Sequence, residues 1–293
     1  MSFESLIGNQ AARISVLALT AVLAAFGARA QVEIQGKRYP DWHGQWSVAA
    51  PRLPGQQLRF DPSKPFGKGQ EAPLTDEYKK IYEANLAEIA KGGQGLFLYH
   101  ASCLPGGMPA IMSAGQFEFI ISPETTWIIQ DNEDVRHIFT DGRPWPEGTD
   151  PTYSGISIGH WVDEAGTGAY DVLEVETRGP FKGPRVYDAS GLPLDFDNES
   201  TFKERFFTDK KDPNILHDVI TVFDHALTRP WTADKAFRRS SAKFPVFDRG
   251  TCLEGNTYVT IGKEYYMVTT DGYLMPTMKG QRPPDPKYFE NQK

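Results

Sequence analysis

Short runs of β-branched and aromatic residues, separated by turn residues, fill the chain from residue 117 onward. Side chains of a strand point alternately to its two faces, so these runs predict strands that each bury one face. The predicted strands cover residues 45–49, 117–121, 126–130, 135–140, 156–162, 172–177, 202–208, 219–225, 258–261 and 265–270. No helices alternate with these runs, which argues against a parallel sheet with crossover helices. The pattern predicts an all-β fold, an antiparallel barrel or a strongly curved sheet with long loops.

One segment has the periodicity of a helix rather than of a strand. Thr75 can cap its start, and the acidic residues at 76 and 77 suit the positive end of the helix dipole. Aromatic and aliphatic side chains recur on one face between residues 78 and 89, and Gly92-Gly93 ends the segment. We therefore expect one α-helix over about residues 75–91 that covers the sheet with its aromatic stripe.

The first 30 residues have the pattern of a signal peptide. Arg13 closes a short cationic region, and residues 14–27 form an apolar run that is shorter than a membrane span of about 20 residues. Ala28-Arg29-Ala30 then presents small side chains at the two positions that a signal peptidase reads. Cleavage is expected near Ala30-Gln31, which predicts a periplasmic or secreted protein with no membrane span in its mature part. An N-terminal membrane anchor is the alternative.

The composition of the chain limits the classes of partner that it can bind and indicates the oxidation state of its cysteines. The net charge is −7 without a basic stripe, which argues against a nucleic acid or an anionic membrane as partner. Only two cysteines occur, Cys103 and Cys252, and a lone pair in an oxidising compartment predicts a disulfide. The disulfide would close a loop of about 150 residues and stabilise the fold by about 5 kcal/mol. The alternative is one buried thiol and one reactive thiol.

These patterns divide the chain into four regions. They are a signal peptide (1–30), an extended N-terminal arm rich in Pro and Gly (31–74), a β-barrel domain with its covering helix (75–275), and a polar, flexible tail (276–293). The oligomeric state stays open.

Several short motifs occur together along the chain. They are Cys103-Leu104-Pro105 with Gly107-Met108-Pro109, Arg136, Asp141-Gly142-Arg143, Gly155, Ser157, Gly159 and Trp161, Val175-Glu176-Thr177, Glu204-Arg205-Phe206, Thr228-Arg229-Pro230-Trp231, and Cys252-Leu253-Glu254-Gly255-Asn256. In this combination the chain resembles a family of exported, largely uncharacterised bacterial proteins. The resemblance implies a lipocalin-like or similar curved β architecture and the same cysteine pair. The family pattern usually carries a His-Ser pair where this chain has Phe196 and Asp197.

Charged residues interrupt the apolar faces of several predicted strands. Because strand side chains alternate, Arg136, Glu176, Glu204 and Asp224 each share a face with apolar neighbours. If these faces line a barrel, the three acids lie near Arg136 or Arg205 in a dry setting, where an unpaired charge is costly. A carboxylate whose pKa is raised there can act as a general acid or base. The alternative is a structural ion-pair network.

Further candidate binding residues surround these charges. Asp141 and Arg143 flank a glycine at the expected barrel rim, where a role in a turn competes with contact to substrate. Trp127, Tyr153, Trp161 and Phe206 can form an aromatic wall, although such residues more often belong to the core. His137 lies on the strand face opposite Arg136, and a histidine there suits proton transfer near neutral pH.

The remaining motifs do not indicate a serine nucleophile, a metal site or a nucleotide site. Gly155-Ile156-Ser157-Ile158-Gly159 has the spacing of a nucleophile elbow but lies in a predicted strand, where glycines allow close approach of a neighbour. The six histidines include no H-x-x-x-H pair and no Cys/His cluster, so no metal is expected. No phosphate-binding glycine loop is present either, so no nucleotide cofactor is expected.

The sequence therefore predicts an enzyme of the lyase, isomerase or hydratase type without an organic cofactor, acting on a small apolar or aromatic compound. Glu176 or Glu204 would move the proton, with Asp224 and His137 as further candidates. Arg136 or Arg143 would hold an anionic group of the substrate. The first alternative is a non-catalytic periplasmic protein that binds a small molecule in the same pocket. The second is an envelope protein that binds partners through its loops.

Overall fold

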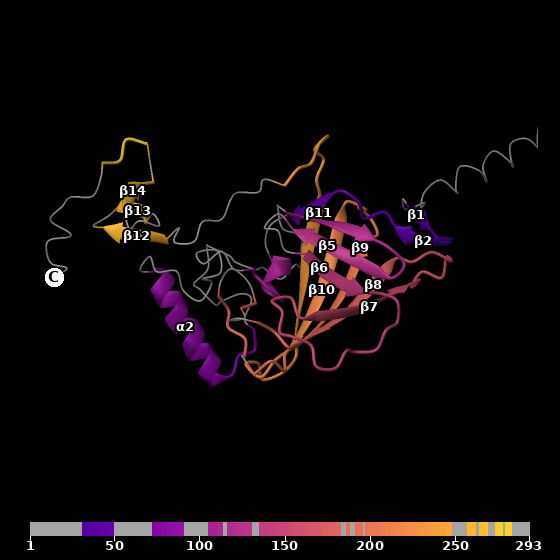
Figure 1. Ribbon diagram of the computed structural model, residues 1–293, viewed down its shortest axis with the longest axis horizontal. Helices are drawn as coiled ribbons and strands as arrows, with labels where there is room; N and C mark the ends of the chain where they lie inside the picture. Colours follow the sequence, from indigo (N-terminus) through magenta and orange to yellow (C-terminus); the bar gives the residue numbers. More distant parts are fainter. Residues whose placement is uncertain are drawn as a thin grey trace, which may run out of the picture.

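The computed structural model describes residues 31–49, 72–90, 105–113, 116–130, 135–182, 186–187, 191–195, 197–247, 257–261, 264–268, 273–277 and 279–282. Its main body is a closed barrel of nine strands (Figure 1). In order around the wall these are β10 (Ile215–Phe223), β11 (Trp231–Arg239), β3 (Gln45–Val48), β4 (Gln116–Ile121), β5 (Thr125–Gln130), β6 (Val135–Phe139), β7 (Ile156–Val162), β8 (Val172–Arg178) and β9 (Thr201–Thr208). The predicted β-barrel is confirmed.

One pair of neighbouring strands departs from the predicted antiparallel arrangement. β6 and β7 run parallel, with Ile138 opposite Ser157, whereas the pairs on either side of them are antiparallel. Residues 140–155 connect the two strands, because a parallel pair needs a crossover connection rather than a tight turn. The close approach depends on Gly159, where a Cβ atom would lie 2.8 Å from Ile138 Cγ2. This glycine thus has the role that the sequence indicated for it.

β11 is a barrel strand that the sequence pattern does not predict. Its inward side chains are Trp231, Ala233, Lys235 and Phe237. A lysine and a small residue within this set obscure the alternation of apolar and polar positions. The N-terminal arm also contains an unpredicted hairpin, formed by β1 (Gln31–Ile34) and β2 (Lys37–Pro40).

The last predicted strands lie outside the barrel. β12 (Thr257–Ile261) and β13 (Glu264–Val268) pair with each other, and β14 (Leu274–Pro276) pairs with β13, to form a separate three-stranded sheet. The prediction that residues 258–261 and 265–270 complete the barrel is therefore wrong. β11 and β3 close it instead, joining the C-terminal and N-terminal parts of the described barrel.

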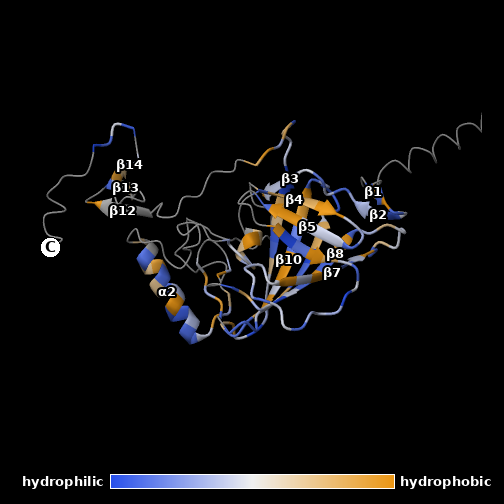
Figure 2. Cartoon of the chain, viewed as in Figure 1, coloured by the Kyte–Doolittle hydropathy of each residue, from blue (hydrophilic) through white to orange (hydrophobic). Residues whose placement is uncertain are grey.

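The barrel interior is filled mainly by aromatic and aliphatic side chains. Orange and blue residues alternate along the barrel strands in Figure 2, as expected when one face of each strand is buried. The largest fully buried apolar side chains are Tyr39, Trp42, Trp46, Met108, Met112, Phe117, Ile128, Phe202, Phe206 and Phe237. A short 3-10 helix, η2 (Ala110–Ser113), adds Ile111 and Met112 to this core.

The predicted helix is present as α2 (Asp76–Ala90), the one α-helix of the described residues, but Ile81 of its apolar stripe is exposed and the helix lies at one end of the barrel rather than over the sheet (Figure 1). Thr75 caps it by accepting a hydrogen bond from the Tyr78 N–H at 3.4 Å. Leu86 is buried, and Asn85 donates to the Gly191 carbonyl at 3.3 Å. α2 and the β1–β2 hairpin lie at opposite ends of the barrel (Figure 1). Within the described parts of the chain, no helix has the length and apolar character to span a membrane.

Candidate functional site in the barrel interior

Arg136 lies inside the barrel on β6 and is held by side chains from three other strands. Its guanidinium donates to both carboxylate oxygens of Glu204 on β9, with 2.9 Å between Nη1 and Oε1. It also donates to Ser157 Oγ on β7 at 3.1 Å and to Thr177 Oγ1 on β8 at 2.8 Å. The exposed fractions of the Arg136 and Glu204 side chains are 1% and 0%. This bidentate pair therefore links β6 to β9 across the interior.

Asp218 is a second acid inside the barrel. It lies on β10, is fully buried, and has no hydrogen-bond partner for either carboxylate oxygen among the described residues. Burial raises the pKa of Asp218 well above its usual range, and the charge of Glu204 raises it further. The charges of Lys235 and Arg136 act in the opposite direction. Such a carboxyl keeps its proton at pH values at which an exposed aspartate has lost it.

Lys235 points into the barrel from β11, directly opposite Asp218 in the β10–β11 pairing. Its Nζ is buried and lies 4.7 Å from the ring centre of Tyr187. The Tyr187 ring packs in turn on Trp231, with the ring centres 4.5 Å apart. The interior thus combines basic side chains from β6 and β11 with acidic side chains from β9 and β10 within an aromatic core.

Glu176 lies on the outer face of β8, so its predicted position inside the barrel is wrong. The inward positions of β8 belong to less polar side chains, namely Leu173, Val175 and Thr177. This register leaves the acidic residues of the strand in contact with water, where an ionised carboxylate has the lowest free-energy cost. Glu176 pairs with Arg178 on its own strand and with Lys203 Nζ on β9 at 3.6 Å.

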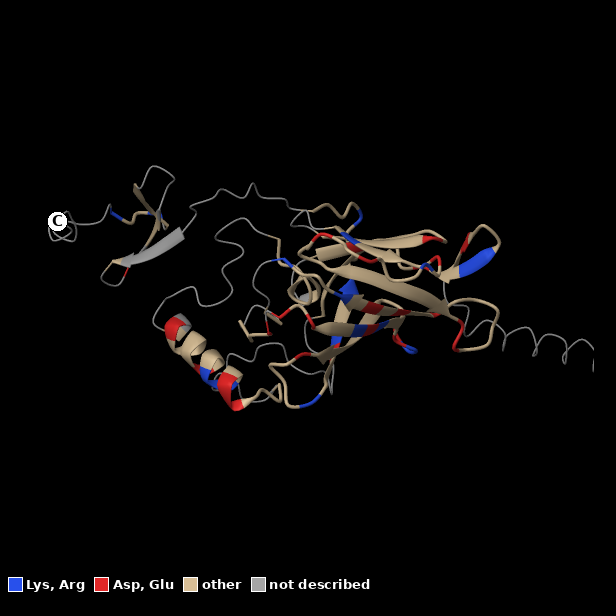
Figure 3. Cartoon of the chain, turned by 60° about the horizontal axis from the view of Figure 1, so that its bottom comes forward, with Lys and Arg blue, Asp and Glu red and all other residues tan. Residues whose placement is uncertain are grey.

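Arg205 also faces outward, and it pairs with Glu174 at 3.1 Å and Glu164 at 2.7 Å. Figure 3 shows acidic and basic positions alternating along barrel strands. A hollow of about 440 Å³ lies over β7, β8 and β9, and its wall includes Trp145 and His160. His160 Nε2 is 3.0 Å from a Glu174 oxygen. Because these charges pair with one another, the outer face fits the structural ion-pair network better than proton transfer.

Asp141 and Arg143 form an ion pair within one exposed turn of the 140–155 connection. Arg143 Nε donates to Asp141 Oδ1 at 2.9 Å, and the Arg143 N–H donates to the same oxygen at 3.2 Å. This hydrogen bonding lowers the pKa of Asp141 to about 2. The Arg143 guanidinium also lies 4.1 Å from the ring centre of Phe139. Of the two roles considered for this segment, these contacts favour the turn.

The predicted aromatic wall is only partly present. The backbone carbonyl of Tyr153 accepts a hydrogen bond from the Met108 N–H at 3.1 Å in the 140–155 connection. Trp161 packs on Trp42 with the ring centres 5.0 Å apart. Phe206 alone lies beside the interior charges, fully buried and directly opposite the acid of β10. Trp161 and Phe206 thus belong to one aromatic core, linked through Trp42 and Phe119, whereas Tyr153 is not part of that core.

His137 points outward from β6, as the alternation with Arg136 predicts. Its ring contacts Trp127 on β5 and Phe139 on its own strand, with ring centres 6.1 Å and 6.4 Å away. It lies outside the barrel, whereas Glu204 and Asp218 lie inside. Direct proton transfer between His137 and these acids is thus not supported.

Asp224 caps a loop instead of lining the barrel, so its predicted inward position is wrong. β10 ends at Phe223, and the carboxylate of the following residue, Asp224, accepts hydrogen bonds from nearby groups of the loops. Asp224 Oδ1 accepts from the N–H groups of Asp195 at 2.9 Å and Ala226 at 2.8 Å, and Oδ2 accepts from the Ser200 hydroxyl. These are the local contacts by which short acidic side chains fix turns.

Asp195, Asp197 and His225 are a group of possible metal ligands within the described residues. Their ligand atoms lie within 4.8 Å of one another. His225 Nδ1 pairs with Asp197, and this contact raises the pKa of His225. Metal binding would have to displace the proton that this ion pair stabilises on the imidazole.

Ser157 is an interior hydrogen-bonding residue, not the nucleophile of an elbow. β7 continues as a strand from Ile156 to Val162, whereas an elbow requires a turn into a helix. Ser157 Oγ lies 2.8 Å from Thr177 Oγ1 and accepts from Arg136. Cys103, Cys252 and the signal peptide lie outside the described residues, so the disulfide and the export of the chain stay predictions.

Asp218 and Lys235 are the interior residues that sequence reasoning missed. The predicted strand began at residue 219, four positions after the true start of β10, and so excluded Asp218. Alternation extended back from Ile220 would have placed this aspartate on the inward face. No comparable signal marks Lys235, because a lysine on a strand normally indicates the solvent face.

Comparison with known protein families, characterised proteins and solved structures gives no match to this chain. The resemblance to exported β-rich proteins therefore stays a prediction. The case for a function rests on the charged group inside the barrel.

Proposed function

We propose that the barrel interior binds a small, largely apolar or aromatic compound and that Asp218 exchanges a proton with it. The reaction would be that of a lyase, isomerase or hydratase that needs no organic cofactor. The supporting observation is a fully buried carboxyl with no hydrogen-bond partner for either oxygen among the described residues. Such a group costs stability unless it is used, and buried acids with raised pKa values are typical of proton-transfer sites.

This proposal assigns the proton transfer to Asp218 rather than to Glu204 or Glu176. Both oxygens of Glu204 are occupied by Arg136. Glu176 faces solvent and pairs with basic neighbours. Arg136 would then act mainly through Glu204, by keeping a negative charge beside Asp218 that favours its protonated form. The N-terminal pattern supports an exported compartment as the place of the reaction.

A non-catalytic carrier is the second candidate. The observation that favours it is the complete set of partners around Arg136, which makes much of the polar interior a fixed framework. In a carrier, Asp218 would donate a hydrogen bond to a bound ligand and no bond of the ligand would change.

The test begins with native mass spectrometry of protein purified from its own host, to identify a retained small molecule. The compound is then offered to the wild type, to Asp218→Asn and to Glu176→Gln. For an enzyme, Asp218→Asn should lower turnover by at least about 100-fold while binding persists. Glu176→Gln should leave turnover unchanged. Full turnover by Asp218→Asn would refute the assignment, and binding without turnover in the wild type would favour the carrier.

A further inference from the structure

The pairing of β10 with β11 places a primary amine beside the interior acid. Lys235 and Asp218 are direct cross-strand partners, and both point into the barrel. Directly opposite residues in an antiparallel pair have Cβ atoms about 5 Å apart. The aliphatic stem of Lys235 can therefore bring Nζ and the carboxyl to the same bound molecule.

The surroundings of the amine are aromatic and dry. Nζ is buried and lies against the Tyr187 ring, which packs on Trp231. In contrast, Lys203 on β9 faces solvent and pairs with Glu176. Burial disfavours the ammonium form of a lysine, whereas an ionised Asp218 would favour it. The neutral amine is the nucleophile used in Schiff-base chemistry.

We propose that Lys235 forms a Schiff base with an aldehyde or ketone bound inside the barrel, with Asp218 carrying the protons of the reaction. The inference rests on the proposed function and names its substrate class, a small apolar carbonyl compound. It explains why the barrel keeps an amine and an acid together in an interior that is otherwise largely apolar.

The reaction balances with the groups present. The Nζ lone pair attacks the carbonyl carbon, and the carbonyl oxygen takes the proton of the Asp218 carboxyl. The carboxylate then takes a proton from the new ammonium, which gives a neutral carbinolamine. Asp218 returns that proton to the hydroxyl, which leaves as water while the nitrogen lone pair forms the C=N bond. The products are an iminium ion on Lys235, the Asp218 carboxylate and one water.

The iminium would make the proposed proton transfer easier. It withdraws electrons from the adjacent carbon, so that a proton on this carbon becomes acidic and the Asp218 carboxylate can remove it. Arg136 and Glu204 stay paired with each other throughout. A lyase or isomerase acting on a carbonyl compound would use this step.

The experiment traps the Schiff base by reduction. Protein purified from cells that express the whole chain is incubated at pH 7 with benzaldehyde, and separately with the smaller propanal, in the presence of sodium cyanoborohydride. Peptide mass spectrometry then locates the added benzyl or propyl groups. Lys203 on the outer face of β9 and Lys182, an exposed lysine beside Tyr153, are internal controls in the same sample. We expect Lys235 to be labelled at least about ten-fold faster than either control.

Two variants complete the design. Lys235→Arg keeps a basic side chain and should lose the fast label, and Asp218→Asn should slow the label on Lys235 without changing that on Lys203. Labelling of Lys235 by both aldehydes at or below the rate of the controls in folded protein would overturn the inference. If Asp218→Asn still abolishes turnover of a compound without a carbonyl group, the proposed function survives and only the Schiff base fails.

Discussion

Arg136 on β6 and Glu204 on β9 form a bidentate ion pair across the interior of the barrel, and both side chains are almost completely withdrawn from water. Removing one partner leaves the other as an unpaired buried charge. Glu204→Gln and Arg136→Met are each expected to lower the free energy of unfolding by about 3–5 kcal/mol. Urea denaturation at pH 7 measures this change.

The matched control for this ion pair lies on the outer face of the same wall. Glu176→Gln removes a carboxylate that is paired with Arg178 and Lys203 in contact with solvent. Exposed pairs contribute about 0–1 kcal/mol, so this variant should unfold close to the wild type. Equal losses for Glu176→Gln and Glu204→Gln would contradict the distinction between inner and outer faces.

Asp218 should make the protein less stable as the pH rises. Because its native pKa is raised above the unfolded value of about 3.9, the native state binds more protons between these two values. The free energy of unfolding therefore falls as pH increases through this window. The Asp218→Asn variant has no carboxyl at this position, so its free energy of unfolding does not fall in this way. The difference in free energy of unfolding between the variant and the wild type should therefore shift in favour of the variant from pH 4 to pH 8. Urea denaturation at several pH values measures this difference.

The wild type and the Asp218→Asn variant have the same charged neighbours around position 218, so the difference between them reports the titration of Asp218 itself. They are Glu204, Arg136, Lys235 and Asp234. If Asp218→Asn is instead destabilised by an equal amount at every pH, then Asp218 is ionised in the native state and its main role is to pair with Lys235.

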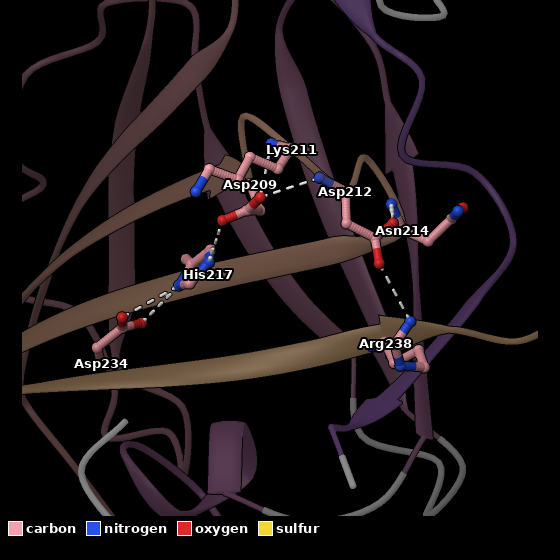
Figure 4. Close-up of polar contacts among 7 residues, drawn as sticks. All are labelled: Asp209, Lys211, Asp212, Asn214, His217, Asp234 and Arg238. Carbon is pink, nitrogen blue, oxygen red and sulfur yellow. Dashed lines mark hydrogen bonds and ion pairs between the residues drawn. The ribbon is translucent and has the colours of Figure 1, made fainter. Parts of the chain in front are cut away.

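His217 on β10 lies between two carboxylates on the outer wall (Figure 4). Its Nδ1 is 3.0 Å from Asp234 Oδ1, and its Nε2 is 3.7 Å from Asp209 Oδ2. Hydrogen bonding to Asp234 raises the pKa of His217, so its contribution to stability is complete below about pH 6.5 and is lost as pH rises through the native pKa. His217→Gln should cost about 0.5–1 kcal/mol at pH 5.5 beyond its cost at pH 9.

Asp234→Asn provides the control for His217. It removes the main partner of the imidazolium, so it should reproduce most of the pH-dependent part of the His217→Gln effect, and the double variant should add little. The His217 ring also stacks on Phe207, with the centres 5.1 Å apart, and this contact is lost equally at both pH values. Identical costs for His217→Gln at pH 5.5 and pH 9 would exclude the ion pair.

Gly159 should resist substitution by alanine for reasons of space. The added Cβ would lie 2.8 Å from Ile138 Cγ2 and 2.9 Å from the Glu174 carbonyl oxygen. Such overpacking costs about 1–3 kcal/mol. Gly142 is the contrasting position, because it has a φ of +78° but no atom within 4 Å of the added Cβ. Gly142→Ala should cost about 1 kcal/mol from backbone strain alone, and thermal unfolding can compare the two variants.

The sequence allowed the strands with regular alternation to be predicted well, and with them the inward positions of Arg136 and Glu204. Glu176 was misplaced because both faces of β8 carry an apolar residue at its start, so that alternation alone left the register ambiguous. Asp218 and Lys235 were missed because charged residues are expected to face solvent. Whether such a charged residue faces the interior depends on a partner from another strand. A single sequence does not reveal which strands become neighbours.

The parallel pairing of β6 and β7 escaped prediction for a related reason. Strand direction depends on the path of the 140–155 connection, which is long enough for either a parallel or an antiparallel pair. The Asp141–Arg143 turn and the glycines of this segment are compatible with either path. The tight fit of Ile138 over Gly159 is visible only once the strands are placed.

Closure of the barrel has a consequence for contacts with other chains. Every one of its nine strands pairs with a strand on each side, so the wall contains no strand with a completely free edge. Another chain therefore finds no fully unpaired strand in this wall, which limits strand addition and edge-to-edge aggregation while the barrel stays closed. Among the described strands, the β1–β2 hairpin and the β12–β14 sheet are open and have edge strands to which another chain could add a strand. An assembly that involves the barrel wall would use mainly its side chains.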